Sequence, residues 1–384
     1  MKRWLNVSWP VIVLGLLVSC GTGSSGRLES VASHQDWDGY VVPEVQDVIT
    51  SAVWNGREMV LVAFDHHGQR FENTVAAYDP TVGTWRDLHD LPSDLPVTVN
   101  ALVASPQGVV ATGVTCDPAT SMIDGDGLAC SPGDIRTFLL PNGDDAFVEI
   151  AAPSRRTTSQ SIPSLAHGVS ADGPYLWVDG SVFRLDQDRQ WVPLGGTPVG
   201  MELCQLGQRL VGVATDPRPP SGSPLDRLVE YDGTSHQWIP LDLPAQGNFG
   251  TLHCGLDAAW FELMNEEPAR REDYLIRSDG DPTRIKTPPN MLVGSITFDG
   301  TQLTTWASEV DPGTLPSDQR GQLYILDTST ATLVSAADRS LPVHATLEVY
   351  PLDGISSLYA TTVPSPDGDF STSYEVDDTP KVAS

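Results

Sequence analysis

Short apolar segments separated by tight polar turns alternate along the chain from about residue 45 to its end. Each predicted unit begins with a hairpin, in which two apolar strands flank a turn such as Asn55-Gly56. The second strands of these hairpins are nearly continuous apolar runs, which is typical of strands buried on both faces. Seven hairpins can be counted, with turns at Asn55-Gly56, Gln107-Gly108, Asp172-Gly173, Leu206-Gly207, Gly255-Leu256, Asp299-Gly300 and Asp353-Gly354.

A second pattern follows six of the hairpins: a turn-forming residue and then, five or six positions later, a large apolar residue that we expect to anchor an outer strand. It is clearest at Tyr78–Pro92 and returns at Tyr231–Pro244. The expected anchors are Trp85, Phe147, Trp191, Trp238, Ile285 and Leu333. Their spacings of 62, 44, 47, 47 and 48 residues fit the four-stranded blades of a β-propeller, and we assign the one long interval to an insertion.

Seven hairpins but six outer motifs leave one blade without its last strand. The segment Trp37–Val42 carries a Trp with no hairpin before it, so we expect it to supply the outermost strand of the seventh blade. Such closure removes an open sheet edge. The prediction is therefore an all-β, seven-bladed β-propeller over residues 37–377, followed by a tail at 378–384. The alternative is a six-bladed propeller with Thr346–Ser384 as an appendage.

The pattern Tyr-Asp-x5-Trp-x2-Leu-x2-Leu-Pro at Tyr78–Pro92 resembles the second half of a kelch repeat. The resemblance, to the galactose oxidase and kelch-type propeller superfamily, extends over residues 37–377. It implies that the aromatic pair packs between blades and that strands from both termini close the ring. Trp37, Trp85 and their counterparts are then structural anchors. The superfamily contains binding modules and a few enzymes, so the fold alone does not give the function.

The first 19 residues are typical of an export signal, with Lys2 and Arg3 before a short apolar core. The core is too short to span a bilayer, which takes about 20 apolar residues. The end of the segment, Leu17–Gly21, resembles a bacterial lipobox, which implies lipidation of Cys20. Residues 20–36 then form a lipidated, flexible tether. We expect a lipid-anchored protein of the bacterial cell envelope, on the outer face of the cytoplasmic membrane or at the cell surface.

The net charge of the chain limits the kinds of partner that it can bind. Without residues 1–19 the chain has 20 basic and 50 acidic residues, a net charge of −30, so nucleic acid is an unfavourable partner and contact with a membrane is expected through the lipid alone.

Four further cysteines allow three pairings. We expect Cys116–Cys130, which share one polar loop, and Cys204–Cys254, which occupy matching places in adjacent repeats; free thiols are the alternative.

Several polar groups are candidates for chemistry, and each has a plainer interpretation. Asp65–Gly68, with His66 and His67, is expected to be a solvated loop rather than a metal site. The loop Asp124–Asp134 resembles part of a calcium site but lacks the spaced ligands of a full loop. Three histidines are placed on inner strands, where they could meet at the axis or simply pack: His167, His253 and His344.

No Ser-His-Asp spacing, phosphate loop, sialidase box or Tyr-His set of a copper oxidase stands out in the sequence. We therefore predict a non-catalytic, monomeric protein without a cofactor, which binds a protein, glycan or small ligand through loop ends or the channel mouth. The alternative is a carbohydrate-active hydrolase or isomerase with acidic and His residues at that mouth. A third hypothesis is a calcium-dependent adhesion module that uses Asp124–Asp134.

Overall fold

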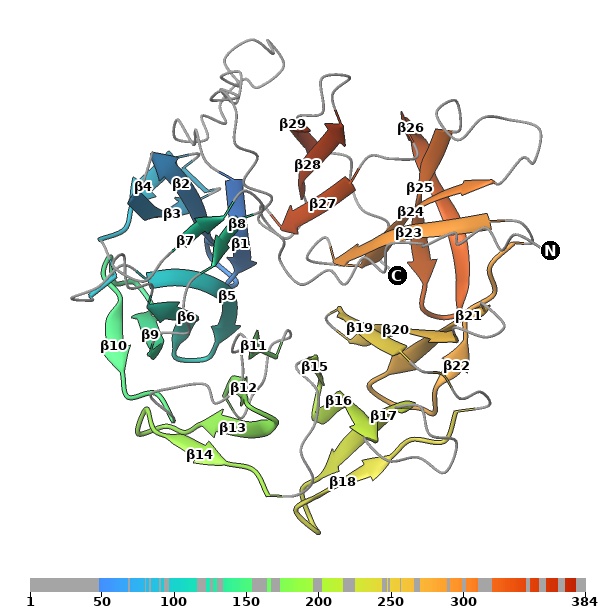
Figure 1. Ribbon diagram of the computed structural model, residues 1–384, viewed down its shortest axis with the longest axis horizontal. Coiled ribbons are helices and arrows are strands. Elements are labelled where there is room, and N and C mark those ends of the chain that lie inside the picture. The colour runs from blue at the N-terminus through green and yellow to red at the C-terminus, as the bar shows by residue number, and fades with distance from the viewer. Residues whose placement is uncertain are drawn as a thin grey trace, which may run out of the picture.

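A computed structural model describes residues 48–377, except for 68–69, 80, 83, 90, 93–96, 116–121, 125–126, 130–133, 154–163, 167–172, 196–201, 217–224, 244–246, 248, 256, 266–269, 289–290, 299–301, 310–319, 343–345, 352–356 and 365–369. All regular elements in these ranges are β-strands, grouped into small sheets that surround a common axis (Figure 1). None of these ranges contains a helix that is long and apolar enough to cross a membrane.

Six four-stranded antiparallel sheets form the blades of a β-propeller. Blade 1 consists of β1 (Val48–Trp54), β2 (Met59–His67), β3 (Arg70–Asp79) and β4 (Thr84–Asp87). Blade 2 consists of β5 (Val97–Ser105), β6 (Gly108–Thr115), β9 (Ile135–Pro141) and β10 (Val148–Ile150). Blade 3 consists of β11 (Ser164–Leu165), β12 (Tyr175–Val178), β13 (Ser181–Leu185) and β14 (Trp191–Pro193).

The next three blades repeat this order from the inner to the outer strand. Blade 4 consists of β15 (Leu203–Leu206), β16 (Arg209–Asp216), β17 (Leu225–Asp232) and β18 (Gln237–Pro240). Blade 5 consists of β19 (Phe249–Cys254), β20 (Ala258–Asn265), β21 (Arg270–Arg277) and β22 (Thr283–Arg284). Blade 6 consists of β23 (Met291–Phe298), β24 (Leu303–Glu309), β25 (Arg320–Asp327) and β26 (Thr332–Pro342).

A three-stranded sheet lies between blade 6 and blade 1 (Figure 1). It consists of β27 (Thr346–Pro351), β28 (Ser357–Pro364) and β29 (Phe370–Asp377), and β27 contacts both β23 and β1. The β-propeller class is thus confirmed, and the six complete blades match the six-bladed alternative. The strand expected to complete a seventh blade, Trp37–Val42, lies outside the described residues, so closure by the N-terminal segment stays a prediction.

The long interval in the predicted spacing contains an insertion, as expected. A small hairpin of β7 (Met122–Asp124) and β8 (Gly127–Ala129) separates β6 from β9, which are neighbours in the sheet. Two hydrogen bonds between Thr115 and Asp134 close the base of the hairpin. The Thr115 N–H donates to the Asp134 carbonyl oxygen at 3.0 Å, and the Asp134 N–H donates to Thr115 Oγ1 at 2.9 Å. The insertion therefore leaves the ladder of blade 2 intact.

One predicted loop is wrong. Asp65, His66 and His67 belong to β2, where they pair with Glu72, Phe71 and Arg70 of β3. The connection between these strands is only 68–69, so the hairpin extends further than the apolar run suggested. Backbone pairing holds polar residues in a strand because the ladder satisfies their N–H and C=O groups whatever the side chain.

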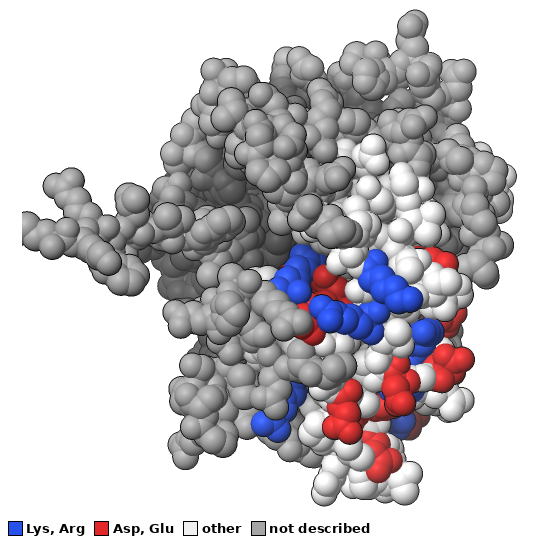
Figure 2. Space-filling model, turned by 90° about the vertical axis from the view of Figure 1, so that its right-hand side faces the viewer, with Lys and Arg blue, Asp and Glu red and all other residues white. Residues whose placement is uncertain are grey.

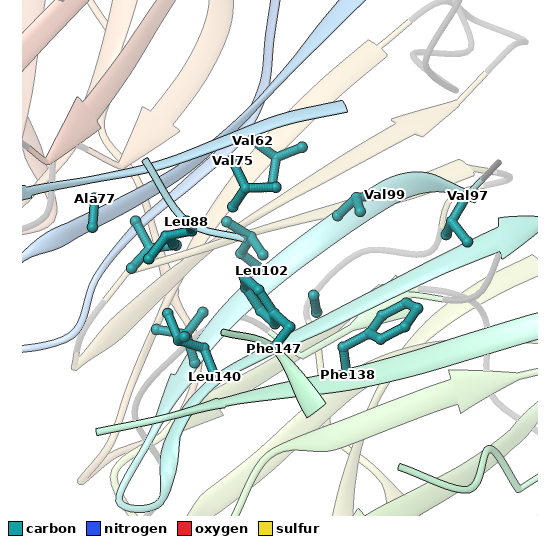
Figure 3. Close-up of a cluster of buried hydrophobic side chains, with 13 residues drawn as sticks. Val62, Val75, Ala77, Leu88, Val97, Val99, Leu102, Phe138, Leu140 and Phe147 are labelled. Atoms are coloured by element: carbon teal, nitrogen blue, oxygen red, sulfur yellow. The ribbon is translucent and has the colours of Figure 1, made fainter. Parts of the chain in front are cut away.

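Apolar side chains fill the space between consecutive blades. The cluster in Figure 3 combines Val62 and Val75 of blade 1 with Leu102, Phe138 and Phe147 of blade 2. Further clusters join blades 2 and 3, blades 3 and 4, blades 4 and 5, and blades 5 and 6 in the same way. A blade buries both faces against its neighbours, which explains the continuous apolar runs of the second strands, such as the buried Gly108–Gly113 stretch of β6.

Glycine is required at the turn before that strand. Gly108 has φ of +140°, and a Cβ at this position would lie 1.9 Å from the carbonyl oxygen of Leu140. A larger residue here would push β6 away from β9. The predicted Gln107-Gly108 turn is therefore fixed by a backbone approach that only glycine permits.

The two faces of the ring differ in their connections. Strands alternate in direction within each blade, so first strands begin where second strands end. We call the face at which first strands begin the loop face and the opposite one the turn face. Connections at the loop face include 116–134, 151–163, 194–202, 217–224, 241–248 and 310–319. Connections at the turn face are short, such as 55–58, 106–107, 207–208 and 255–257, with 166–174 the long exception.

Candidate functional site: a carboxylate seam at the loop face

Three contacts join blade 4 to the inner strand of blade 5. The Gly250 N–H donates to Asp226 Oδ2 at 2.8 Å, and the Leu252 N–H donates to Glu202 Oε2. Two residues further on, Cys254 forms a disulfide with Cys204, with a Cα–Cα distance of 5.3 Å. Residues 250, 252 and 254 are alternate positions of β19, and each makes one of these contacts with blade 4. We call this row of three contacts the blade 4–5 seam.

Local sequence explains why the two chains approach so closely. A Cβ on Gly250 would lie 2.6 Å from Phe261 Cζ and 3.4 Å from Asp226 Cβ, so glycine lets β19 approach the aspartate. Glu202 directly precedes β15, and Asp226 is the second residue of β17. First and third strands begin at the same face, so both carboxylates reach the loop face of the ring.

A second group of charges lies behind the seam, on blade 5. The Arg271 guanidinium contacts Glu262 Oε2 at 3.2 Å and Asp273 Oδ1 at 2.9 Å, and its Nη1 donates to the Val293 carbonyl oxygen of blade 6 at 3.0 Å. Asp273 also accepts the Trp260 indole N–H at 2.8 Å. Arg271 therefore neutralises two carboxylates and links blade 5 to blade 6.

The seam holds an acid with an unusual proton affinity. Burial raises the pKa of Glu202 from 4.5 to about 7; the Leu252 N–H lowers it, and the negative charges of Asp226 and Glu262 raise it further. The pKa of Glu262 is also raised, mainly by burial, and Arg271 opposes that shift. Glu202 is therefore a carboxyl group that exchanges its proton near neutral pH.

The turn face is fastened by arginine instead. Arg86 pairs with Glu58 at 2.8 Å and donates to the Asp144 carbonyl oxygen of blade 2 at 3.2 Å. Arg209 pairs with Glu230 at 2.8 Å and donates to the Gly280 carbonyl oxygen of blade 5 at 2.7 Å. In both cases a guanidinium from one blade reaches the turn before the fourth strand of the next.

The Arg86 contact lines an open cleft of about 330 Å³ at the turn face. Its walls come from Arg57, Glu58, Asp79, Val82, Thr84, Arg86 and Gly143. Because Arg86 and Glu58 satisfy each other, the cleft offers few unpaired polar groups for a ligand. On the side of the ring viewed in Figure 2, basic and acidic side chains are likewise interspersed, so the described part of that surface shows no separate positive patch.

The predicted anchors lie between blades where the structure describes their side chains. Phe147, Trp191 and Trp238 are buried in clusters that join their own blade to the preceding one. Ile285 and Leu333 lie in the cluster between blades 5 and 6. Trp85 is in β4 and pairs with Tyr78, but its side chain lies outside the described set, as does all of Trp37.

The other predicted site residues are only partly described. The Cys204–Cys254 disulfide is confirmed. Cys20, Cys116, Cys130, His167 and His344 lie outside the described residues. His253 is on the inner strand β19, as predicted, and is half-buried. The loop with Asp124 and Asp134 contributes to no group of three His, Cys, Asp or Glu residues that could hold a metal in the described part of the chain, and no other such group is found there.

Sequence reasoning missed Glu202 and Asp226. Their partners are backbone N–H groups of the next blade, which carry no side-chain signature. One signal was present: Glu202 and Leu252 have the same 50-residue offset as Cys204 and Cys254.

Neither a protein-family model nor a curated protein matches the sequence. Solved structures do match. A puromycin-hydrolysing peptidase of Mycobacterium tuberculosis has a TM-score of 0.50 at 13% identity, over 89% of this chain and 54% of the peptidase. A chain of the mitotic checkpoint complex has a TM-score of 0.46 at 10% identity, over 87% of this chain and 91% of that one. The tricorn protease has a TM-score of 0.42 at 12% identity, over 82% of this chain and 30% of the protease.

At such identities the similarity concerns the fold alone. The chain spans about a third and about half of the two peptidase chains it matches. Together with the ring of small antiparallel sheets, the match to the puromycin-hydrolysing peptidase identifies the class of this protein as a β-propeller.

Proposed function

We propose that this chain is a non-catalytic, kelch-like β-propeller that binds a protein, glycan or small ligand at its loop face. The observation that carries the proposal is the difference between the two faces. Most of the long connections join strands at the loop face, which also has two-residue turns at 68–69 and 179–180, whereas short turns and arginine contacts predominate at the turn face. Binding residues of rigid scaffolds are concentrated in such loops.

Envelope anchoring is part of the same proposal. The lipobox-like Leu17–Gly21 segment supports lipidation at Cys20, and residues 20–36 would hold the ring away from the membrane. The Cys204–Cys254 disulfide agrees with an oxidising compartment. Replacing Cys20 with Ala should move the protein from the membrane fraction to the soluble fraction. Continued membrane retention of Cys20→Ala would refute the lipid anchor.

The binding proposal can be tested with two variants of the purified protein. In one, the loop-face connection 217–224 is replaced by an Asn-Gly turn between β16 and β17. In the matched control, the exposed turn-face residue Thr234 is replaced by Lys. Capture from an envelope extract and a glycan array should give a bound partner for the wild-type chain and the control, and a weaker one for the loop variant. Absence of any bound partner, together with sugar turnover, would contradict the proposal.

A carbohydrate-active hydrolase or isomerase is the second candidate, and Glu202 is the observation that favours it. A carboxyl group with a pKa of about 7 suits a general acid, and carboxylate pairs with separated pKa values are a common arrangement for that role. Asp226, which accepts the Gly250 N–H beside it, would be the second carboxyl group of such a site. Turnover of a polysaccharide or monosaccharide substrate that is lost in Glu202→Gln would establish this function.

A further inference from the structure

Among the described residues, the blade 4–5 seam combines carboxyl groups that accept inner-strand N–H groups with a disulfide. Asp226 and Glu202 accept N–H groups from alternate residues of β19, at the end of the seam nearest the loop face. The Cys204–Cys254 disulfide lies at the other end. One end of the seam is therefore held by hydrogen bonds to ionisable groups, and the other by a covalent bond.

The groups around Glu202 are mostly of its own sign. Asp226 comes from β17 and Glu262 from β20, and both act on Glu202 through their negative charges. Arg271 and Asp273 of β21 pair beside Glu262, so the cation there is already shared between two carboxylates. On β19 itself, His253 is the one ionisable side chain. Ionised Glu202 thus lies in a poorly solvated place beside further negative charge.

We propose that the blade 4–5 seam is a pH-sensitive hinge, closed in mildly acidic solution and opened from its loop-face end at neutral and higher pH, with the Cys204–Cys254 disulfide as the fixed point. A protonated Glu202 still accepts the Leu252 N–H and carries no charge into the buried seam. An ionised Glu202 gains more water by moving outward, away from Asp226. Opening would separate the beginning of β15 from the beginning of β19.

The direction of the effect follows from proton linkage. The pKa of Glu202 is near 7 in the closed seam and returns toward 4.5 when the side chain reaches water. The closed state is therefore favoured fully below about pH 4.5, and that advantage is lost as the pH rises toward 7. Over this window the opening equilibrium should rise by up to about tenfold per pH unit, on the order of a hundredfold in total, and level off above it.

Native-state amide hydrogen exchange of the wild-type chain from pH 5 to pH 8 tests the proposal directly. After correction for intrinsic exchange, the opening constants of the Leu252 and Gly250 amides should increase with pH. The matched control is the Leu102 amide, which donates to Ser51 Oγ at 3.1 Å between blades 1 and 2 and whose opening constant should stay flat. The same corrected pH profile for Leu252 and Leu102 would overturn the hinge.

Two variants separate the hinge from general loosening. In Glu202→Gln, the Leu252 opening constant should be low and independent of pH. In Cys204→Ala/Cys254→Ala, opening should spread beyond the loop-face end of the seam into the amides around Leu206. An increase with pH that involves Leu206 as much as Leu252 in the wild-type chain would contradict the disulfide as the fixed point.

Discussion

The junction between blades 1 and 2 and the junction between blades 4 and 5 are fastened alike at the turn face and differently between their inner strands. On the turn face each has an arginine, Arg86 or Arg209, that pairs with a glutamate of its own blade and reaches a carbonyl oxygen of the next. Between the inner strands each has a side-chain oxygen that accepts an N–H of the next blade: Ser51 Oγ accepts that of Leu102, and Glu202 Oε2 accepts that of Leu252.

The arginine contacts that the two junctions share have a different cause from the Ser51 and Glu202 contacts in which they differ. A side-chain donor that reaches a carbonyl oxygen in the turn before the fourth strand of the next blade recurs at these two junctions, and Gln107 makes the same contact with Asp186 between blades 2 and 3. The acceptor between the inner strands needs only an oxygen, and Ser51 supplies one without charge. A carboxylate at Glu202, accompanied by Asp226 and a disulfide, is more than packing requires. That excess distinguishes blades 4 and 5 as a place where the ring can respond to conditions.

Removing the Cys204–Cys254 disulfide should change the free energy of unfolding more than any other substitution proposed for the two junctions. Cys204→Ala/Cys254→Ala opens a link between residues 50 positions apart, and loss of such a constraint on the unfolded chain costs about 2–4 kcal/mol. Urea unfolding of the oxidised wild type and the double variant measures the difference. The junction between blades 1 and 2 has no such link among its described residues, so Ser51→Ala is the control and should cost about 1 kcal/mol. Equal losses in the two would show that the disulfide adds nothing to the seam.

Replacing Arg86 and Arg209 should reduce the free energy of unfolding by different amounts, because their glutamate partners differ in burial. The side chain of Glu58 is 6% exposed, whereas that of Glu230 is 28% exposed. Arg86→Ala leaves a buried charge unpaired and should cost about 2–4 kcal/mol, and Arg209→Ala about 1–2 kcal/mol, because water can solvate Glu230. Exposed Arg57 is the control, with a loss of less than about 0.5 kcal/mol on replacement by Ala. A larger loss for Arg209→Ala than for Arg86→Ala would contradict this role of burial.

The effect of replacing Glu202 should depend on pH, whereas the effect of replacing Ser51 should not. The closed fold favours the protonated Glu202, so wild-type stability falls between about pH 4.5 and 7. Glu202→Gln should therefore match the wild type near pH 4.5 and exceed it by roughly 1–3 kcal/mol at pH 8. Ser51→Ala should reduce the free energy of unfolding by the same amount at both pH values. Parallel pH curves for Glu202→Gln and wild type would show that the acid is solvated in the folded chain.

The sequence predicts the length and arrangement of the blades better than it predicts the polar contacts between them. The outer-strand motif at Tyr78–Pro92 and its echo at Tyr231–Pro244 gave the blade length, because a buried aromatic and a polar turn recur wherever a blade ends. That length was enough to place Cys204 opposite Cys254. The same motif could not place Glu202 against Leu252, since one partner is a backbone N–H in a different blade.

The end of β2 and the blade 4–5 seam are two places where backbone hydrogen bonds determine the structure and the sequence pattern does not reveal them. His66 and His67 looked like a loop because a polar run carries no strand period, yet backbone pairing with Phe71 and Arg70 extends the hairpin through them. At the seam, backbone groups again determine the outcome, because Gly250 and Leu252 donate N–H groups that no side chain indicates. Apolar spacing reports which surfaces are buried; it does not report which backbone groups remain to be satisfied.

The smallest predicted effects lie at the outer turns, where blades 1 and 4 should be equivalent. Asp79 accepts the Thr81 N–H at 2.8 Å, and Asp232 accepts the Thr234 N–H at 2.9 Å, each in the turn before the fourth strand. Hydrogen bonds from the side chains of Thr81 and Ser235 lower the pKa of the two carboxyl groups, so their contribution to stability is present above pH 3.8 and lost as the pH falls further.

Asp79→Ala and Asp232→Ala should therefore lower the melting temperature slightly and equally at pH 7, and by less in acid once the pH has fallen through the lowered pKa of each carboxyl group. Asn at either position keeps an acceptor oxygen and should recover part of the loss. Asp327, whose pKa is lowered to about 2 by Ser329 and Thr330, should retain its effect to the lowest pH of the three. Unequal losses for Asp79 and Asp232 at pH 7 would mean that blades 1 and 4 differ at their rims as well as along their inner strands. The contrast between the two junctions would then no longer be confined to Glu202 and its seam.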